Sequence, residues 1–277
     1  MEIKASDVKA LRDKTGAGMM ECKKALSEAN GDAAQAEKIL KEKGLAAVAK
    51  RAERATSEGR IFVRQNGSKI AIAEVTCETD FVAKNADFIA MGEKILDAIF
   101  AKGYTKVEKE LEDMVLELAT KIRENMSLRR VEVIEVPANA AASTYVHSNF
   151  KTAAAVVIEG SDGDVAKEFA HDCCLHLAAF TPAYINKADI PQSYIDEQKE
   201  IFEAQMAQDE KMASKPENVK AGILQGKINK HLAEICFVDQ MFVKDDKVSV
   251  AKKLEEVSKT AGAKLSFGKV ALFVLGK

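Results

Sequence analysis

The chain has 277 residues, 47% of them hydrophobic and 30% charged, and its 41 basic and 43 acidic side chains nearly cancel. This content can fill more than one core, while a net charge of −2 argues against a protein that mainly binds nucleic-acid phosphates. The sequence contains neither a membrane-spanning hydrophobic run nor a signal-peptide core, so we expect a cytoplasmic protein that does not contact membranes.

Residues 1–44 predict a small domain of three short helices, separated by glycine-containing turns and ended by Gly44. The second helix begins with two methionines, whose flexible side chains suit a hydrophobic contact with a partner. The alternative is that Met19 and Met20 lie in the core of this small domain, which we expect of at least one of them.

Residues 45–59 are rich in Ala, Lys and Arg and show no hydrophobic stripe. This composition predicts a solvated, helical linker. An alternative is that Lys50, Arg51 and Arg54 contact phosphates.

Residues 60–140 predict the first half of an α+β core. An Asn66–Gly67 turn joins two β-rich runs, which is a strong hairpin signal. Helical periodicity follows over residues 86–100 and 107–122, and residues 130–136 alternate as a strand.

Residues 141–277 repeat the order of hairpin, helix, helix and strand. The hairpin is predicted over 144–158, the first helix over 165–180, a second helix after the cap residue Ser249, and closing strands over 265–275. The pattern therefore predicts two related α+β halves.

An insertion at residues 191–235 interrupts the second half. Pro191 suits a first helical turn, and hydrophobic side chains line one face on each side of a break at 213–216. We expect a projecting antiparallel helical hairpin, an element that usually binds a partner or a second copy of the chain.

Residues 171–176 combine two histidines and two cysteines, which invites a metal or thiol-enzyme interpretation. On one helix, however, only Cys173 and His176 share the hydrophobic face, and four ligands cannot converge from a single helix. The alternative is a core-lining Cys173 and His176 beside an exposed His171 and Asp172.

Other catalytic signatures are absent from the sequence. It contains no GxxxxGK[ST] phosphate loop, no nucleophile elbow and no zinc motif, so we expect no GTPase or other catalytic site, no metal and no cofactor. The cysteines are odd in number and lack metal spacing, and we expect all to be reduced. They are Cys22, Cys77, Cys173, Cys174 and Cys236.

The stretch from Thr79 to Phe88 lies between a predicted strand and a predicted helix. It places the carboxylate of Asp80 beside the large hydrophobic ring of Phe81. One interpretation is that Thr79 or Asp80 begins a helix and Phe81 packs inward.

Two motifs favour another interpretation. The stretch 79–88, together with 15–26, closely resembles the bacterial elongation factor Ts family, and the resemblance extends over essentially the whole chain, including residues 121–125 and 239–243. It implies a ubiquitin-associated-like N-terminal domain, a two-part core, and a coiled-coil dimerisation module at 191–235. It also implies guanine-nucleotide exchange on elongation factor Tu, the GTPase that delivers aminoacyl-tRNA.

The resemblance further implies how exchange occurs. The family motif that dislodges Mg²⁺ from the partner corresponds to Thr79, Asp80, Phe81 and Val82, with Phe81 as the wedge. All four residues match the motif, so we expect them to form the principal contact with the GTPase.

At other positions that contact the partner in the family, this sequence matches the family only in part. Positions that match family contacts are Met19, Met20, Lys23, Ile122, Arg123, His147, His171, Asp172 and Val243. Arg123 replaces a common glycine, His171–Asp172 replaces a Lys-Asp or Lys-His pair, and Met241 replaces a proline whose φ is fixed.

Two rival functions remain. One is nucleic-acid binding through Lys50, Arg51, Arg54, Arg129 and Arg130, although the near-neutral charge and the lack of interleaved aromatic residues argue against it. The other is a metal or thiol enzyme built on residues 171–176. We expect a protein partner and no direct contact with nucleic acid.

Overall fold

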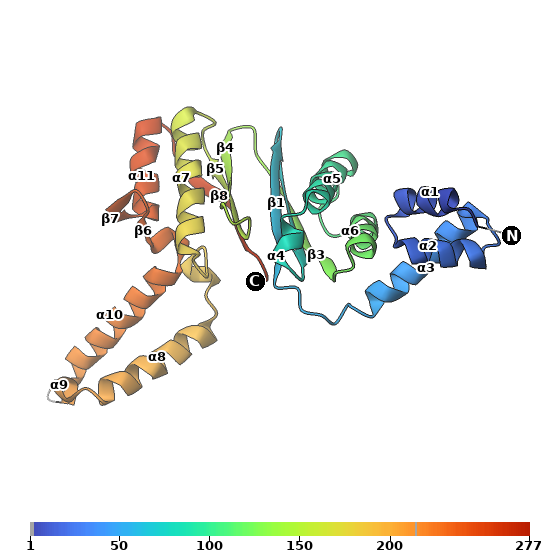
Figure 1. Cartoon of the computed structure of the whole chain (residues 1–277). Helices are drawn as coiled ribbons and strands as arrows, with labels where there is room; N and C mark the ends of the chain where they lie inside the picture. Colours follow the sequence, from blue (N-terminus) through green and yellow to red (C-terminus); the bar gives the residue numbers. More distant parts are fainter. Residues whose placement is uncertain (1–2, 214) are drawn as a thin grey trace. The chain divides into compact units, whose positions relative to one another are not determined.

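The computed structural model describes residues 3–213 and 215–277 (Figure 1). The chain divides into two compact units. The first runs to Glu135 and also takes in Val146–Thr152 and Phe273–Lys277, and the second comprises Val136–Tyr145 and Ala153–Leu272. Both units combine helices with strands, which confirms the predicted α+β class.

Three helices open the first unit: α1 (Ala5–Thr15), α2 (Met19–Glu28) and α3 (Ala33–Ala49). Gly16, at φ 68°, ends α1 in the left-handed conformation that favours glycine. The small core that the helices share contains Val8, Leu11, Cys22, Ala25, Leu26, Ala29 and Ala36. The three predicted helices are therefore present.

Gly44 does not end the third helix as predicted, because α3 continues to Ala49 and buries Val48. A Cβ atom at Gly44 would lie 2.2 Å from Cγ2 of Thr120 on α6 (Lys109–Ile122). The glycine thus permits two helices to approach closely, a use that a single sequence does not distinguish from a helix stop.

The first unit contains an antiparallel sheet of order β1-β2-β3, formed by β1 (Glu58–Asn66), β2 (Lys69–Cys77) and β3 (Met126–Glu135). The β1–β2 turn passes through Gly67 at φ 56°, as the Asn-Gly signal predicted. The third strand begins earlier than predicted, directly after the loop that follows α6.

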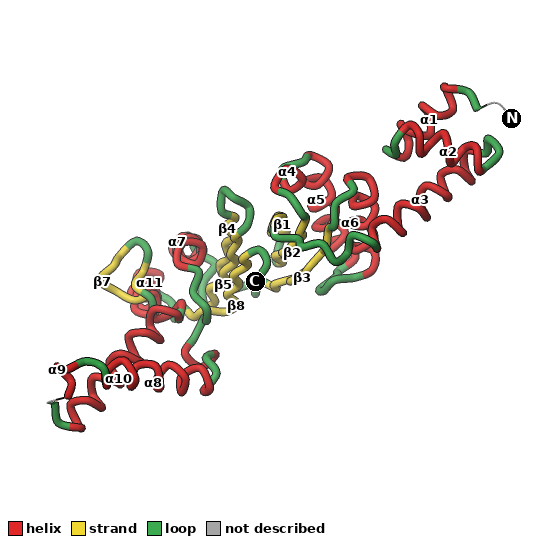
Figure 2. The backbone as a smooth tube through the Cα atoms, turned by 60° about the horizontal axis from the view of Figure 1, so that its bottom comes forward, coloured by secondary structure: helices red, strands yellow, loops and turns green. Residues whose placement is uncertain are grey.

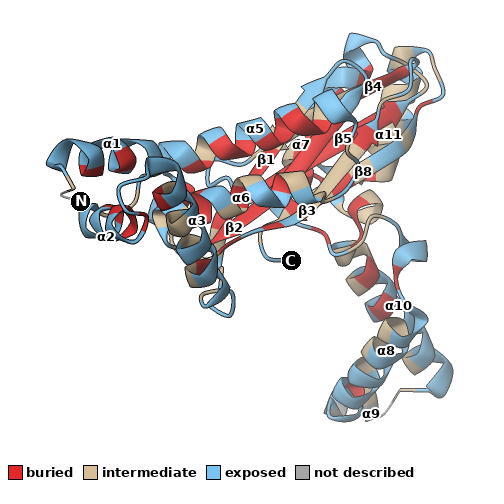
Figure 3. Cartoon of the chain, turned by 90° about the vertical axis from the view of Figure 1, so that its right-hand side faces the viewer, coloured by how far each residue is buried: buried red, intermediate tan, exposed pale blue. Residues whose placement is uncertain are grey.

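Helices α5 (Ala86–Lys102) and α6 pack with this sheet around the core of the first unit. Figure 3 shows the buried residues along the strands and on one side of these helices. Large members of this core are Phe62, Phe88, Met91, Ile95, Leu96, Ile99 and Leu111. The segment between β2 and α5 is consequently held at both ends by buried elements.

Glu74 on β2 is fully buried and ties the end of the chain to the first sheet. Its carboxylate accepts hydrogen bonds from Arg129 Nη1 at 3.0 Å, Arg130 Nε at 2.5 Å and the Gly276 N–H at 2.8 Å. A buried carboxylate needs such donors because its charge is otherwise costly to desolvate. Arg129 and Arg130, two of the basic residues considered for nucleic-acid binding, are therefore engaged by an internal carboxylate.

The second unit repeats the predicted order. Its sheet has the order β4-β5-β8, from β4 (Ala140–Val146), β5 (Thr152–Glu159) and β8 (Ser266–Val274). Its core also includes residues of α7 (Asp164–Phe180) and α11 (Val250–Ala261). A single closing strand is present where closing strands were expected.

Two short strands were not predicted. They are β6 (Met241–Phe242) and β7 (Asp245–Ser249), which pair just before α11. Ser249 caps α11 as predicted, since its hydroxyl accepts the Lys252 N–H at 3.3 Å. Strands this short carry too little alternation to be recognised in the sequence.

The insertion is a helical hairpin of α8 (Gln192–Ala207), the short α9 (Glu210–Ala213) and α10 (Glu217–Ile235), as predicted. Figure 2 shows α8 and α10 running beside each other. The predicted break at 213–216 includes Ser214, which lies outside the described residues. The hairpin shares a small hydrophobic cluster whose buried members are Ile190, Ile228, Leu232 and Cys236.

Across residues 3–213 and 215–277, no helix is long and hydrophobic enough to cross a membrane. The cysteines all lie in this part of the chain, where each is free and buried.

Candidate protein-binding site

The segment Thr79–Val82 follows β2 directly and opens the short helix α4 (Asp80–Ala83). Thr79 is extended and its hydroxyl accepts the Val82 N–H at 3.4 Å, so it is the helix cap. Asn85 begins α5 in the same way, with its side-chain oxygen 2.8 Å from the Asp87 nitrogen. The prediction that a helix starts at Thr79 or Asp80 is confirmed.

The ring of Phe81 is 82% exposed, the largest value for a big hydrophobic side chain in the described part of the chain. The residues that follow it, Val82 and Ala83, are 7% and 8% exposed and belong to the core. The interpretation in which Phe81 packs inward is therefore wrong. The short helix anchors itself through Val82 and Ala83 and directs the phenyl ring to the solvent.

The carboxylate of Asp80 remains charged beside this ring. Its Oδ2 atom lies 2.6 Å from Nζ of Lys84, and the hydrogen bond from Lys84 is the main reason that the pKa of Asp80 is lowered. Both side chains face water, so this ion pair orients the carboxylate more than it stabilises the fold.

The strand end is fixed by Cys77, whose thiol donates to the Thr79 carbonyl at 3.2 Å. Burial, aided by the nearby charge of Glu124, raises the pKa of this thiol to about 12. The sulfur consequently stays protonated at neutral pH and keeps its role as a donor. The hydrogen bond helps to fix the backbone just before Phe81.

The contact residues predicted in the N-terminal domain lie on α2. Met19 and Met20 are 51% and 71% exposed, and Lys23 is exposed as well, whereas Cys22 is fully buried. The expectation that at least one methionine lies in the core is therefore wrong, and both thioethers are open to a partner. Met19 and Lys23 are four residues apart and share one helix face.

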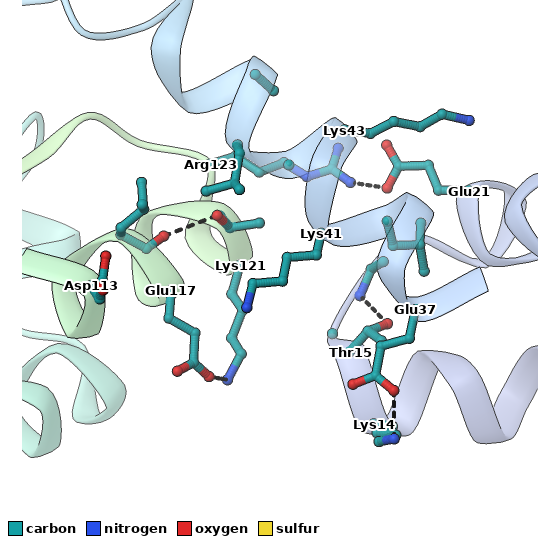
Figure 4. A pocket seen from close by; sticks show the side chains of 18 of the residues that line it. Lys14, Thr15, Glu21, Glu37, Lys41, Lys43, Asp113, Glu117, Lys121 and Arg123 are labelled. Atoms are coloured by element: carbon teal, nitrogen blue, oxygen red, sulfur yellow. Dashed lines mark hydrogen bonds and ion pairs between the residues drawn. The ribbon is translucent and has the colours of Figure 1, made fainter. Parts of the chain in front are cut away.

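Arg123 follows α6 in the left-handed conformation, at φ 69°, where a glycine is the usual residue. Its guanidinium forms an ion pair with Glu21 of α2, while the preceding Ile122 packs against the core of the first unit. The arginine thus adopts a backbone conformation typical of glycine, and its side chain forms a contact within the chain (Figure 4).

A pocket lies beside that ion pair, lined by residues of α1, α2, α3 and α6 (Figure 4). Its charges are largely paired with one another, as in Lys14–Glu37 at 2.5 Å and Lys121–Glu117 at 3.2 Å. Arg123 is the member of the predicted contact set that lines it.

His147 opens the exposed turn between β4 and β5, within the first unit. Its N–H donates to the Thr152 carbonyl at 2.9 Å. Phe150, at φ 59°, places its ring 3.4 Å below the guanidinium carbon of Arg60 and its carbonyl 2.9 Å from the Ile61 nitrogen. The turn that carries His147 is therefore held against β1 by this cation–π contact and this hydrogen bond.

The contact residues predicted on α7 differ in exposure. His171 is exposed, with its Nδ1 3.3 Å from the Ser143 hydroxyl. Asp172 is only 8% exposed and forms an ion pair of 2.6 Å with Lys244. The expectation of an exposed Asp172 was wrong. The residue that pairs with its carboxylate, Lys244, lies far along the chain and cannot be recognised from the sequence around Asp172.

His176 is fully buried and organises the turn that carries Val243. Its Nδ1 accepts the Val243 N–H at 3.2 Å, which leaves Nε2 to donate to Gln240 Oε1 at 2.9 Å. Burial lowers the pKa of this imidazole, so it is neutral at pH 7. Val243 and Met241 are thereby presented at 37% and 58% exposure.

The metal interpretation of residues 171–176 finds no support in the geometry. Cys173 and His176 are buried and His171 is exposed, as the core interpretation predicted. No group of three metal-ligating side chains comes together in the described ranges.

Comparisons with known proteins identify the family of the chain. A model of the family "Elongation factor TS" matches residues 78–277. The chain belongs to the elongation factor Ts family. It is 56% identical to an elongation factor Ts of Treponema denticola, covering 100% of this chain and 99% of that protein. It is 49% identical to one of Treponema pallidum strain Nichols, with 100% and 99% covered, and 41% identical to one of Borrelia duttonii, with 96% of each covered.

Family membership confirms the resemblance in the sequence. It assigns the chain to translation elongation, as a nucleotide-exchange factor for elongation factor Tu and not a GTPase. The Thr79–Val82 motif, Lys23 and His147 all belong to the first unit, whereas His171, Asp172 and Val243 belong to the second.

Proposed function

We propose that this chain releases GDP from elongation factor Tu by inserting the ring of Phe81 into the partner and displacing the Mg²⁺ that helps to hold the nucleotide. The 82% exposure of Phe81 is the observation that carries the proposal. The ring stands on a capped turn whose next residues are buried, so it is offered to a partner at little cost in ordering.

The physical requirement on an exchange factor is differential affinity. A GTPase holds its nucleotide through a phosphate loop and a bound Mg²⁺. A protein that binds the nucleotide-free form more tightly than the loaded form weakens nucleotide binding by the same factor. A ring that fits only where partner elements have moved away from the Mg²⁺ site provides that difference.

Asp80 adds a charge beside the ring. Its carboxylate is ionised and faces water, held by Lys84. Brought near a Mg²⁺ site, a carboxylate competes for the ion and repels its acidic ligands. We therefore assign the main effect to Phe81 and a secondary one to Asp80.

Further contacts would hold the two proteins together. The exposed Met19 and Met20 offer adaptable hydrophobic surface, with Lys23 on the same helix. The turn at His147, the exposed His171 and the Val243 turn offer contacts for other parts of the partner. Asp172 would take part mainly by holding Lys244.

Two further points belong to the proposal. The first is that the chain binds no guanine nucleotide by itself.

The second is that the α8–α10 hairpin mediates self-association, because its long helices project from the second unit as an arm. Replacing residues 191–235 with a short flexible linker should change the sedimentation coefficient while the rate of GDP release stays near the wild-type value. Loss of exchange without any change in self-association would contradict the role given to the arm.

The test of the wedge is the Mg²⁺ dependence of GDP release. Fluorescent GDP bound to elongation factor Tu is displaced by excess GDP in the presence of the wild-type chain or Phe81→Ala, at millimolar Mg²⁺ and again in EDTA. At millimolar Mg²⁺ we expect a large loss of stimulation by the variant. In EDTA the two proteins should differ much less, since the ion that the ring displaces is already gone.

A matched control is Val165→Ala, which truncates another exposed hydrophobic residue, 39% exposed at the start of α7. It should behave as the wild type under both conditions. Equal losses for Phe81→Ala with and without Mg²⁺ would show that the ring supplies binding energy only, and the displacement mechanism would be rejected.

A further inference from the structure

Glu124 lies in the loop after α6, far along the chain from the Thr79–Val82 motif, yet its carboxylate binds the start of that motif. Its Oε2 accepts the N–H groups of Glu78 at 3.2 Å and Thr79 at 3.1 Å. Its Oε1 accepts the hydroxyl of Thr79 at 2.6 Å. One carboxylate thus receives three hydrogen bonds from two consecutive residues.

These bonds fix the direction of the helix cap. The Thr79 hydroxyl has one hydrogen, and donating it to Glu124 leaves its lone pairs for the Val82 N–H. Hydrogen bonds to an ionised carboxylate are stronger than those between neutral groups. The orientation of α4, and with it the direction of Phe81, therefore depends on Glu124.

The contact is reciprocal. The Oε1 atom of Glu78 accepts the Asn125 N–H at 2.6 Å, so each segment binds a backbone amide of the other. The side-chain amide of Asn125 donates to the carbonyls of Ala52 at 3.1 Å and Arg54 at 2.7 Å. The loop that carries Glu124 is itself held in place and forms a firm support.

We propose that Glu124 is a positioning residue for nucleotide exchange. It does not touch the partner in this role; it holds Thr79 and the preceding amide so that Phe81 points outward in one orientation. This inference rests on the proposed function, since it assigns Glu124 a role through the Phe81 ring. A wedge is effective only when its supporting residues keep it in place before contact.

The test measures GDP release with Glu124→Gln, Phe81→Ala and the double variant. Glutamine keeps the size of the side chain but removes the charge and turns one acceptor into a donor that faces N–H groups. We expect Glu124→Gln to slow stimulated GDP release about tenfold, a factor that corresponds to ~1.4 kcal/mol. In the Phe81→Ala background the same substitution should cause little additional loss, because the ring through which Glu124 acts is absent.

Hydrogen exchange of the isolated chain gives an independent measurement. The amides of residues 78–83 should exchange faster in Glu124→Gln, while those of α5 remain protected. Thr79→Val, which removes the hydroxyl that donates to Glu124, should resemble Glu124→Gln in both measurements. Glu117→Gln, an exposed change on α6 that removes only the ion pair with Lys121, serves as the matched control.

The outcomes separate the two proposals. If Phe81→Ala exchanges at the full rate, the proposed function fails whatever Glu124 does. If Phe81→Ala is impaired and Glu124→Gln is not, only the positioning role fails. Equal proportional losses from Glu124→Gln in both backgrounds would overturn the inference too, because a general structural effect is independent of the ring. Thr79→Val keeps the test decisive should Glu124→Gln fail to fold.

Discussion

Two phenylalanines of the first unit stand at successive helix starts and have opposite environments. Phe81 on α4 is 82% exposed, and Phe88 on α5 is fully buried. In both helices the third residue after the cap faces the core, Val82 in one and Phe88 in the other, and the second faces water. That second residue is Phe81 in α4 and Asp87 in α5. The comparison teaches that a hydrophobic ring occupies a position that the fold itself leaves to solvent.

The largest expected effect is on the buried ring. Phe88→Ala should lower the free energy of unfolding by ~3–5 kcal/mol, since it leaves a cavity in a packed core. Urea unfolding followed by circular dichroism measures this. Phe81→Ala should change the same quantity by no more than ~1 kcal/mol, as expected away from the core. A comparable loss for both variants would remove the distinction between the two rings.

The next prediction makes the two helix starts alike. Phe81→Asp gives α4 the residue type that α5 carries at Asp87, and an acidic side chain in a first turn interacts favourably with the helix dipole. We expect unchanged or slightly raised stability together with a fall in stimulated GDP release of about thirtyfold, the scale of a ~2 kcal/mol hot-spot loss. Full exchange activity in Phe81→Asp would show that the exposed ring is not needed.

Local signals made much of this arrangement predictable from the sequence. The Asn66–Gly67 turn, the Ser249 cap and the helical periodicity of 86–100 each rest on residues close together in the chain, and each predicted element is present. The exposure of Phe81 was different, because hydrophobicity alone favours an inward ring. The resemblance to a known motif suggested the outward direction, and the pattern of hydrophobic residues did not.

The features that were mispredicted depend on contacts between distant residues. Gly44 lies inside a helix, where the lack of a side chain gives room for Thr120 of α6. Asp172 is buried, and the positive charge of the distant Lys244 pairs with its carboxylate. Glu124 was not singled out at all, since its three donors lie on residues 78 and 79. A single sequence does not show which distant residues meet, so charged side chains that serve a tertiary role look like ordinary surface residues.

A smaller effect is expected at the cap of the second helix. Asn85→Ala removes the acceptor for the Asp87 N–H and should cost ~1 kcal/mol of stability, the usual value for a lost cap. GDP release at 25 °C should be unchanged, because α5 positions the core and not Phe81. Asn85→Asp keeps an acceptor and should match the wild type in thermal unfolding. Slower exchange in Asn85→Ala would mean that the two helix starts move together.

The smallest effect is expected at Asp80. Asp80→Asn removes one charge from a solvent-exposed ion pair with Lys84, so the melting temperature should not change measurably. GDP release should slow less than in Phe81→Asp, because the carboxylate assists displacement of Mg²⁺ while the ring performs it. Charge–charge contacts are screened by salt, so the difference between Asp80→Asn and the wild type should shrink as KCl is raised, whereas the deficit of Phe81→Asp should persist. A loss in Asp80→Asn as large as that in Phe81→Asp, independent of salt, would transfer the main role from the ring to the carboxylate.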